Sequence, residues 1–148
     1  MAKKRFVIED KFECDGFPCV CIFNAMAIRV GYVGIDSTHP YYGMDYATDG
    51  PDGIMCHWGL TYAGKAYWDD ESDLWWFGFD CGHCEDKHDT QTAISYGLID
   101  ENQAFLLDAF GHLVLTDDKS VRDLDFVKDN CKLIAAQLGI VVRGCMNA

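Results

Sequence analysis

The sequence VRDLDFVKDNCKLIAAQLG, residues 121–139, has the clearest periodicity in the chain. Its apolar residues recur at alternating steps of three and four positions, which is the spacing of one face of an α-helix; they are Leu124, Val127, Cys131, Ile134 and Leu138. Ser120 and Asp123 resemble a capping pair before this run, and Gly139 is typical of a helix end. The segment predicts an amphipathic helix of about five turns, whose apolar face must pack on something else.

Strand-like segments in the first half of the chain supply that partner. Runs rich in β-branched and aromatic residues, separated by Gly, Pro and Asn, are typical of strands; they cover residues 4–9, 18–25, 27–35, 54–62 and 74–80. The short breaks between the first runs favour an antiparallel meander, whereas residues 36–53 are turn-rich and predict a long loop. The expected fold is α+β, an antiparallel sheet of about five or six strands packed against one long C-terminal helix.

Three further segments carry weaker signals. Residues 140–142 (IVV) would form a closing strand, residues 102–110 a short helix and residues 112–116 another strand. The sequence has no internal repeat, low-complexity tract or linker. A single globular domain over residues 1–148 is therefore expected.

Charge is concentrated in the middle of the chain. The net charge is −12, and residues 36–101 alone hold 14 acidic residues against Lys65 and Lys87. The same segment holds 12 of the 20 aromatic residues, including all four Trp. An acidic and aromatic surface repels phosphate backbones and attracts cations or basic proteins, so direct nucleic-acid binding is disfavoured.

The sequence also lacks the features expected of membrane-spanning and secreted proteins. It has no apolar run of about 18 residues, so no membrane span is expected, and its first residues lack the apolar core of a secretory signal. The expected location is cytoplasmic. The eight cysteines are then expected to be thiols, with a metal or redox pair among them as an alternative to simple burial.

The densest cluster of reactive side chains is FDCGHCEDKHD, residues 79–89. As a redox motif, Cys81 and Cys84 have the C-x-x-C spacing of a dithiol. That interpretation lacks support nearby, because all three prolines precede the motif and no βαβ pattern surrounds it. A solvated acidic turn is the plain alternative.

Two other interpretations use the same segment. As a metal site, Cys81, Cys84 and His88 would join His57 (or Cys56) around zinc or another divalent cation. As a hydrolytic site, Asp80, His83 and Asp86 stand at three-residue steps and would act with His57 on a bound substrate or cation. No phosphate loop, nucleophile elbow or His-Glu-x-x-His motif accompanies them.

Aromatic and acidic residues before this segment suggest a binding surface. Trp58, Tyr62 and Trp75 would line it, with Asp80 and His83 as polar anchors for a small ligand. Adjacent residues of a half-buried strand point to opposite faces, so Trp75 and Trp76 cannot both enter one core. A partner protein would meet the acidic run Asp69, Asp70, Glu71 and Asp73.

Several segments resemble small accessory proteins of unassigned function from tailed bacteriophages and prophages. The segments are GYVGIDSTHPYYG (31–43), CHWGLTY (56–62), LWWFGFDCGH (74–83) and the helical residues 121–138. The resemblance implies a bacterial host cytoplasm during infection as the setting. It also implies these motif positions: His57, Gly59, Leu60, Thr61, Tyr62, Gly78, Phe79, Asp80 and His83.

The leading functional hypothesis is thus a phage-type accessory binding protein. Its acidic, aromatic middle segment would engage a basic surface of a host protein, or a small ligand, and so counter host defence. The alternative is a small metal-dependent hydrolase that uses His57, Asp80, His83 and Asp86.

Overall fold

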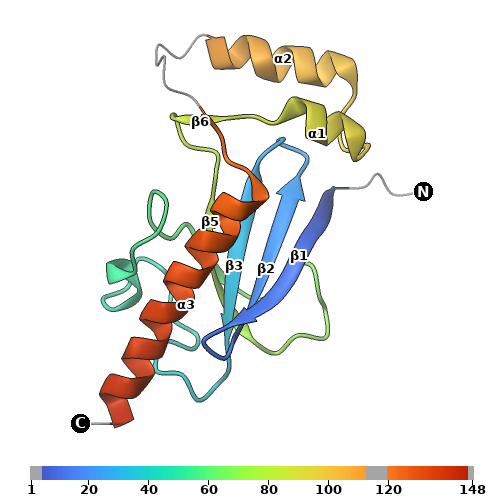
Figure 1. Cartoon of the computed structure of the whole chain (residues 1–148). Helices are drawn as coiled ribbons and strands as arrows, with labels where there is room; N and C mark the ends of the chain where they lie inside the picture. The colour runs from blue at the N-terminus through green and yellow to red at the C-terminus, as the bar shows by residue number, and fades with distance from the viewer. Residues whose placement is uncertain (1–4, 113–119, 147–148) are drawn as a thin grey trace.

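The computed structural model describes residues 5–112 and 120–146, which form a sheet crossed by one long helix (Figure 1). Five antiparallel strands lie in the order β1-β2-β3-β5-β4. Their bounds are β1 Phe6–Cys14, β2 Phe17–Asn24, β3 Arg29–Ile35, β4 Tyr62–Gly64 and β5 Trp75–Asp80. The predicted α+β fold, with an antiparallel sheet and a C-terminal helix, is confirmed.

Tight turns set the register of the first three strands. Asp15 and Gly16 link β1 to β2 with φ values of +53° and +83°, and an Asp-Gly pair at positive φ is the preferred two-residue hairpin turn. Ala27 has φ +62° in the next turn. The meander predicted from the short breaks is therefore built from local turns.

Helix α3, Leu124–Met146, covers one face of the sheet (Figure 1). Four of its predicted apolar positions are buried, namely Val127, Cys131, Ile134 and Leu138. They pack on sheet residues that include Cys21, Val33 and Phe77. Gly31 allows this approach, since a Cβ there would lie 2.8 Å from Cys131 Sγ and 2.6 Å from Phe79 Cε1.

The opposite face of the sheet has a core of its own. Its buried residues are Val20, Ile22, Val30, Tyr32, Ala66 and Trp76. Residues 65–74 cover this face, with Trp68 and Leu74 packed on it. Trp75 packs in the core beneath α3 and Trp76 in the opposite core, as predicted from strand alternation.

A third group of elements lies at one end of the sheet. Helices α1, Thr90–Ser95, and α2, Glu101–His112, pack near Phe23 and Ala27 (Figure 1). Strand β6, Asp86–Lys87, pairs in parallel with β7, Ser120–Val121. The helix predicted over residues 102–110 is confirmed within α2. The strand predicted over 112–116 falls outside the described residues, apart from His112 at the end of α2.

The C-terminal helix differs from its predicted bounds at both ends. It continues through Gly139 to Met146, so the closing strand predicted at 140–142 is wrong. Gly139 is buried inside the helix, where a Cβ would lie 3.8 Å from Phe17 Cε2. At the other end Asp123 alone caps the helix, accepting a hydrogen bond from Phe126 N at 2.9 Å. Ser120 belongs to β7.

The strand predicted at residues 54–62 is also wrong, because residues 54–61 form an irregular loop that leads into β4. Side-chain contacts replace the missing strand pairing, since Gln137 bonds both the N–H and the carbonyl of Met55. The long turn-rich segment predicted at 36–53 is confirmed and contains one 3-10 turn, η1, Pro51–Gly53. Across the described ranges, no helix is both long and apolar enough to cross a membrane.

Candidate functional site

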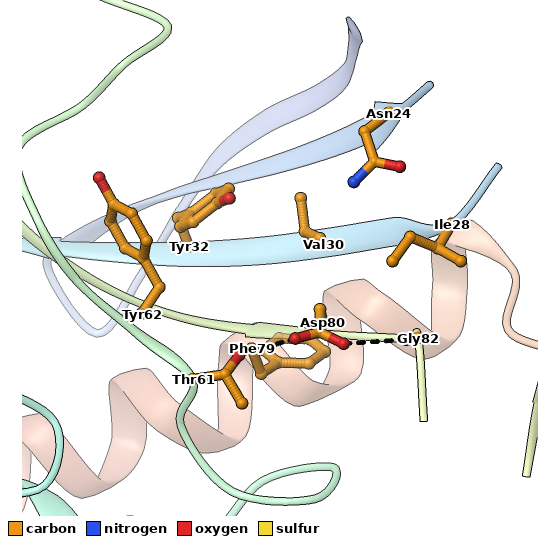
Figure 2. A pocket seen from close by; sticks show the side chains of 9 residues that line it. All are labelled: Asn24, Ile28, Val30, Tyr32, Thr61, Tyr62, Phe79, Asp80 and Gly82. Atoms are coloured by element: carbon orange, nitrogen blue, oxygen red, sulfur yellow. Dashed lines mark hydrogen bonds between the residues drawn. The ribbon is translucent and has the colours of Figure 1, made fainter. Parts of the chain in front are cut away.

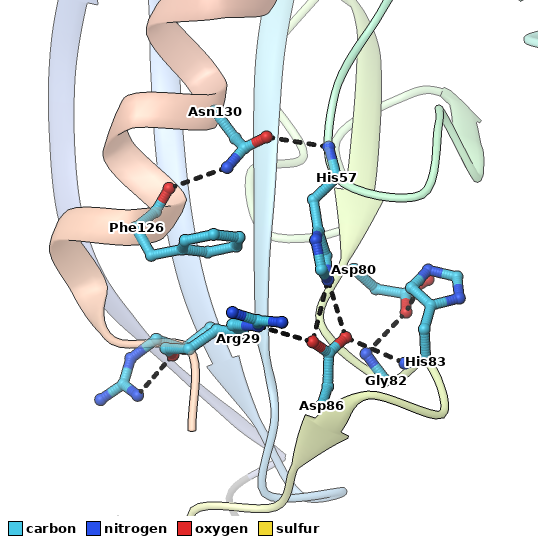
Figure 3. Close-up of polar contacts among 9 residues, drawn as sticks. Arg29, His57, Asp80, Gly82, His83, Asp86, Phe126 and Asn130 are labelled. Atoms are coloured by element: carbon cyan, nitrogen blue, oxygen red, sulfur yellow. Dashed lines mark hydrogen bonds and ion pairs between the residues drawn. The ribbon is translucent and has the colours of Figure 1, made fainter. Parts of the chain in front are cut away.

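The turn after β5 surrounds the carboxylate of Asp86. Its Oδ1 accepts a hydrogen bond from Arg122 Nε at 2.8 Å, and its Oδ2 accepts one from His83 N at 3.0 Å. His57 Nε2 lies 2.9 Å from both oxygens (Figure 3). Burial opposes ionisation of Asp86, but the hydrogen bonds from Arg122 and His57 outweigh it and hold its pKa below the ordinary value.

His57 is held from two sides by α3. Its backbone N–H donates to Asn130 Oδ1 at 2.8 Å (Figure 3), and its ring packs nearly perpendicular to that of Phe126, with ring centroids 5.0 Å apart. Because an ionised carboxylate only accepts hydrogen bonds, the bond to Asp86 places a proton on His57 Nε2. The imidazole therefore joins the irregular loop to the turn after β5.

Trp58 and His83 form a stacked pair beside this carboxylate. Their ring centroids are 5.1 Å apart and the planes differ by 16°. Trp58 is 53% exposed and has φ +58°, a left-handed conformation that is uncommon for a bulky residue. His83 Nε2 is buried and, among the described residues, makes no hydrogen bond, although Asp80 Oδ1 lies 3.4 Å away.

Asp80 at the end of β5 connects this cluster to a pocket on the sheet. Thr61 Oγ1 donates to its Oδ2 and Gly82 N to its Oδ1, both at 2.9 Å. The carboxylate is partly exposed. It lines a pocket of about 350 Å³ with residues of four strands and the neighbouring turns (Figure 2), namely Asn24, Ile28, Val30, Tyr32, Thr61, Tyr62, Phe79 and Gly82.

Gly78 explains how two tyrosines meet at this pocket. It stands opposite Tyr32 of β3 and Tyr62 of β4 in the strand register. A Cβ at Gly78 would lie 2.5 Å from Tyr32 Cδ1. Without it, the rings of Tyr32 and Tyr62 pack edge to face with centroids 5.1 Å apart. The absence of a side chain at Gly78 thus shapes one wall of the pocket.

The same face of the sheet carries the acidic segment. Every carboxylate predicted there is exposed, namely Asp69, Asp70, Glu71 and Asp73. Tyr67 of the same segment is 49% exposed, and its hydroxyl lies 2.8 Å from that of Tyr32. Residues 36–53 adjoin this segment, because Tyr42 Oη donates to the Asp73 carbonyl at 2.7 Å and Trp75 Nε1 to the Met44 carbonyl at 2.9 Å.

The cysteines of the C-x-x-C motif are not arranged as a redox pair. Cys81 is buried, and burial raises the pKa of its thiol to about 12. A redox dithiol needs a lowered pKa, commonly at a helix N-terminus. The element that follows β5 is instead the short strand β6. Cys81 therefore behaves as a buried apolar residue.

The predicted zinc ligands also separate. His88 Nδ1 lies 2.6 Å from the Met26 carbonyl, His57 is bound to Asp86, and Cys84 lies in an exposed turn. Within residues 5–112 and 120–146, no group of three or more His, Cys, Asp or Glu side chains is arranged to hold a metal ion. The expected set of Cys81, Cys84, His88 and His57 is thus not a ligand set in this structure.

The remaining predicted residues fall into three places. The four residues of the hydrolase hypothesis come together, with His57 on Asp86 and His83 beside Asp80. Of the predicted small-ligand pocket, Tyr62 and Asp80 share one cavity, but Trp58 stacks on His83 outside its lining and Trp75 faces the α3 side. The acidic run lies on the loop that covers the sheet.

Sequence reasoning missed several members of the cluster and the pocket. Asn130 lies in α3, and Arg122 lies just before that helix. Thr61 comes from the loop before β4, and Asn24 is the last residue of β2. Asn130 sits one residue before the apolar position Cys131, and nothing in the helical pattern marks it for a role. Only Thr61 had a signal, as a motif position of the phage resemblance.

Comparison of the chain with known protein families, with curated proteins and with solved structures finds no match.

Proposed function

We propose that this chain is a binding protein whose acidic, aromatic middle segment engages a basic surface of a partner protein. The observation that carries the proposal is the covering segment 65–74. It buries Ala66 and packs Trp68 on the sheet, yet within residues 69–73 it exposes four carboxylates, and it also exposes the ring of Tyr67. A fixed loop that presents charge beside an aromatic ring supplies both attraction and contact area.

Residues 36–53 carry further acidic side chains and meet this segment at the Tyr42–Asp73 contact, although Tyr41 and Tyr42 pack in the core beneath α3. Asp45, Asp49 and Asp52 are exposed on the adjoining residues 36–53. Lys65 is the one basic residue in the sequence between positions 36 and 80. Clustered charge of one sign attracts an oppositely charged partner over about 8–10 Å at physiological salt and speeds its association. A basic protein surface fits this field, and a phosphate backbone does not.

The setting of the proposal comes from the resemblance to phage accessory proteins. In that setting the partner is a basic surface of a bacterial host protein, met in the host cytoplasm, and binding counters a host defence. Such a role requires no turnover by this chain.

A charge-matched pair of variants tests the binding surface. The patch variant changes Asp69, Asp70 and Asp73 to Asn and Glu71 to Gln. The control variant changes four exposed acids outside the patch, namely Glu13→Gln, Glu101→Gln, Asp125→Asn and Asp129→Asn. Both variants raise the net charge by four units, so they differ in position and not in total charge.

The readout is capture of proteins from bacterial host lysate, followed by salt elution and calorimetry with the purified captured protein. The patch variant should bind about tenfold more weakly or worse, while the control variant keeps wild-type affinity. Wild-type binding should also weaken as salt is raised. Equal loss, or no loss, in the two variants would overturn the proposal.

The alternative function is a small metal-dependent hydrolase. It is favoured by the meeting of His57, Asp80, His83 and Asp86, and by the unbonded Nε2 of His83. It is opposed by the saturated carboxylate of Asp86, which already accepts bonds from three residues. Metal-supplemented ester and phosphoester assays decide it: turnover lost in His83→Gln and kept in the control His88→Gln would replace the binding proposal.

A further inference from the structure

The pocket at the end of β5 has one charged wall and an apolar floor. Asp80 supplies the charge, and the buried side chain of Val30, with Ile28 beside it, supplies the floor (Figure 2). Val30 and Asp80 are direct neighbours in the β3–β5 register, so their side chains stand on the same face. The pocket therefore juxtaposes a carboxylate with a short apolar surface.

The carboxylate of Asp80 keeps capacity for a cation. The hydrogen bonds from Thr61 and Gly82 use one acceptor site on each oxygen, and a carboxylate offers about four such sites. Across residues 5–112 and 120–146, no Lys or Arg lies within ion-pair distance of it. The nearby basic side chain is the imidazole of His83, whose Nε2 lies 3.4 Å from Asp80 Oδ1. The fixed orientation of the carboxylate and the absence of a Lys or Arg partner within the described residues favour a cationic group from outside.

Two further features limit the shape of that group. The ring of Tyr62 forms a wall of the pocket, and aromatic faces attract ammonium and guanidinium groups. Asn24 Oδ1 accepts a bond from Met26 N at 3.0 Å, which leaves the amide nitrogen toward the pocket (Figure 2). That N–H group can donate to a peptide carbonyl. A volume of about 350 Å³ is at the small end of ligand sites, suited to one long side chain.

We infer that this pocket admits a lysine or arginine side chain of the partner protein. The charged head pairs with Asp80, and the methylene stem lies on Val30 and Ile28, as long basic side chains commonly do on apolar surfaces. The inference rests on the proposed function, because it identifies the group by which a basic partner is anchored on this face. An anionic ligand is excluded by the charge of Asp80.

Titration of the full chain by NMR tests the pocket without the partner. The probes are Nα-acetyl-lysine N-methylamide, the corresponding arginine derivative, and the uncharged norleucine derivative of similar length. The two basic probes should shift the backbone amides of Thr61, Asp80 and Gly82 in a saturable way. The norleucine probe should bind at least fivefold more weakly. Equal shifts with norleucine would overturn the inference.

Two variants test whether the basic probes bind through the pocket or through the overall negative charge of the protein. Asp80→Asn keeps the acceptor shape, and Asp129→Asn makes the same charge change at an exposed site outside both the pocket and the acidic patch. Binding of the basic probes should fall at least fivefold in Asp80→Asn and stay unchanged in Asp129→Asn. If Asp80→Asn fails to fold, Thr61→Val serves instead, because it removes a bond that orients Asp80 and should weaken binding at least twofold.

The remaining outcomes distinguish this inference from the proposed function. If the patch variant loses the partner while Asp80→Asn keeps both partner and probe, the pocket inference fails and the binding function stands. If the probes bind through Asp80 but the patch variant keeps the partner, the proposed surface fails instead. A free diamine, putrescine, that binds more tightly than the lysine probe would assign the pocket to small amines and overturn the partner side chain.

Discussion

His57 Nε2 lies 2.9 Å from each carboxylate oxygen of Asp86, although 29 residues separate the two in the chain. The contact joins the irregular loop before β4 to the turn after β5. Arg122 binds the same carboxylate from the segment before α3. One buried charge therefore connects the irregular loop to the β6–β7 pair, of which Asp86 is itself a member.

Replacement of Asp86 by Asn should lower the free energy of unfolding by about 1.5–3 kcal/mol, because charge-assisted hydrogen bonds from Arg122 and His57 lose their acceptor charge. Urea unfolding followed by circular dichroism measures the change. The control Glu85→Gln alters an exposed neighbouring carboxylate and should stay within about 0.5 kcal/mol of wild type. A similar loss in both variants would contradict the role of this ion pair.

Acidification should remove the contribution that the ionised Asp86 carboxylate makes to the free energy of unfolding. The pKa of Asp86 is lowered in the folded protein relative to an ordinary value of about 3.9. Its charge therefore stabilises the fold above about pH 4, and this stability is lost as the pH falls through the lower folded pKa. The stability difference between wild type and Asp86→Asn should shrink as the pH falls below about 4, as measured by urea midpoints. A difference that stays constant over this range would contradict the prediction.

Asn130→Ala should loosen the loop that carries His57. The backbone N–H of His57 loses its 2.8 Å bond to Asn130 Oδ1, so its amide should exchange with solvent about fivefold or more faster. Asn130→Asp is the control, because it keeps an acceptor for His57 while it replaces the donor to the Phe126 carbonyl by a charged oxygen. Hydrogen exchange followed by NMR should therefore show the His57 amide protected in the wild type and in Asn130→Asp, but not in Asn130→Ala.

Gly139→Ala tests the continuation of α3 through its glycine. Inside a helix this change should leave the free energy of unfolding unchanged or raise it by about 0.5–1 kcal/mol. The nearest atom to the new Cβ is Arg143 Nη1 at 3.3 Å, which ends a flexible side chain. A helix that ended at Gly139 in a left-handed conformation would instead be destabilised.

Gly31→Ala is the contrasting variant. Its Cβ would lie 2.6 Å from Phe79 and 2.8 Å from Cys131, both in the packed core beneath α3. Overpacking there should cost about 1–3 kcal/mol. Thermal unfolding of Gly31→Ala and Gly139→Ala side by side gives the comparison, and equal midpoints would show that the helix does not approach β3 this closely.

Cys81 should react slowly with thiol reagents. Its pKa is raised by burial to about 12, so very little thiolate forms at pH 8. Cys145 is exposed and provides the reference thiol. Alkylation by iodoacetamide, followed by peptide mass spectrometry, should modify Cys81 at least about a hundredfold more slowly than Cys145 until the protein is unfolded. Comparable rates would restore the redox interpretation.

The success and failure of the sequence predictions follow from what each pattern encodes. The apolar spacing from Val127 to Leu138 identified the buried face of α3 correctly, because helix geometry fixes which residues share a side. Residues 54–61 have strand-like composition but form a loop, since Gln137 and Asn130 of α3 satisfy backbone groups that a neighbouring strand would otherwise bond. Such long-range partners leave no local pattern in the sequence.

The candidate site was predicted in part. His57, Asp80, His83 and Asp86 were identified from residue type and spacing, and they do meet. Asp80, His83 and Asp86 stand at three-residue steps in the sequence, and the turn between β5 and β6, with no helix there, brings their side chains close to one another. Arg122 was not predicted as a member of this cluster, because its bond to Asp86 depends on the β6–β7 pairing.

The sequence by itself determined the fold class, the alternation that sends Trp75 and Trp76 to opposite faces, and the concentration of acid in the middle segment. These are local properties, fixed by the periods of helix and strand and by the order of charged residues. The tertiary structure decided that Asp86 is an ion-pair centre, that Gly139 lies inside a helix, and that Asp80 lines a pocket with Val30. Each of these depends on which distant segments become neighbours. Those neighbours are fixed by tertiary packing, when α3 covers one face of the sheet and residues 65–74 cover the other.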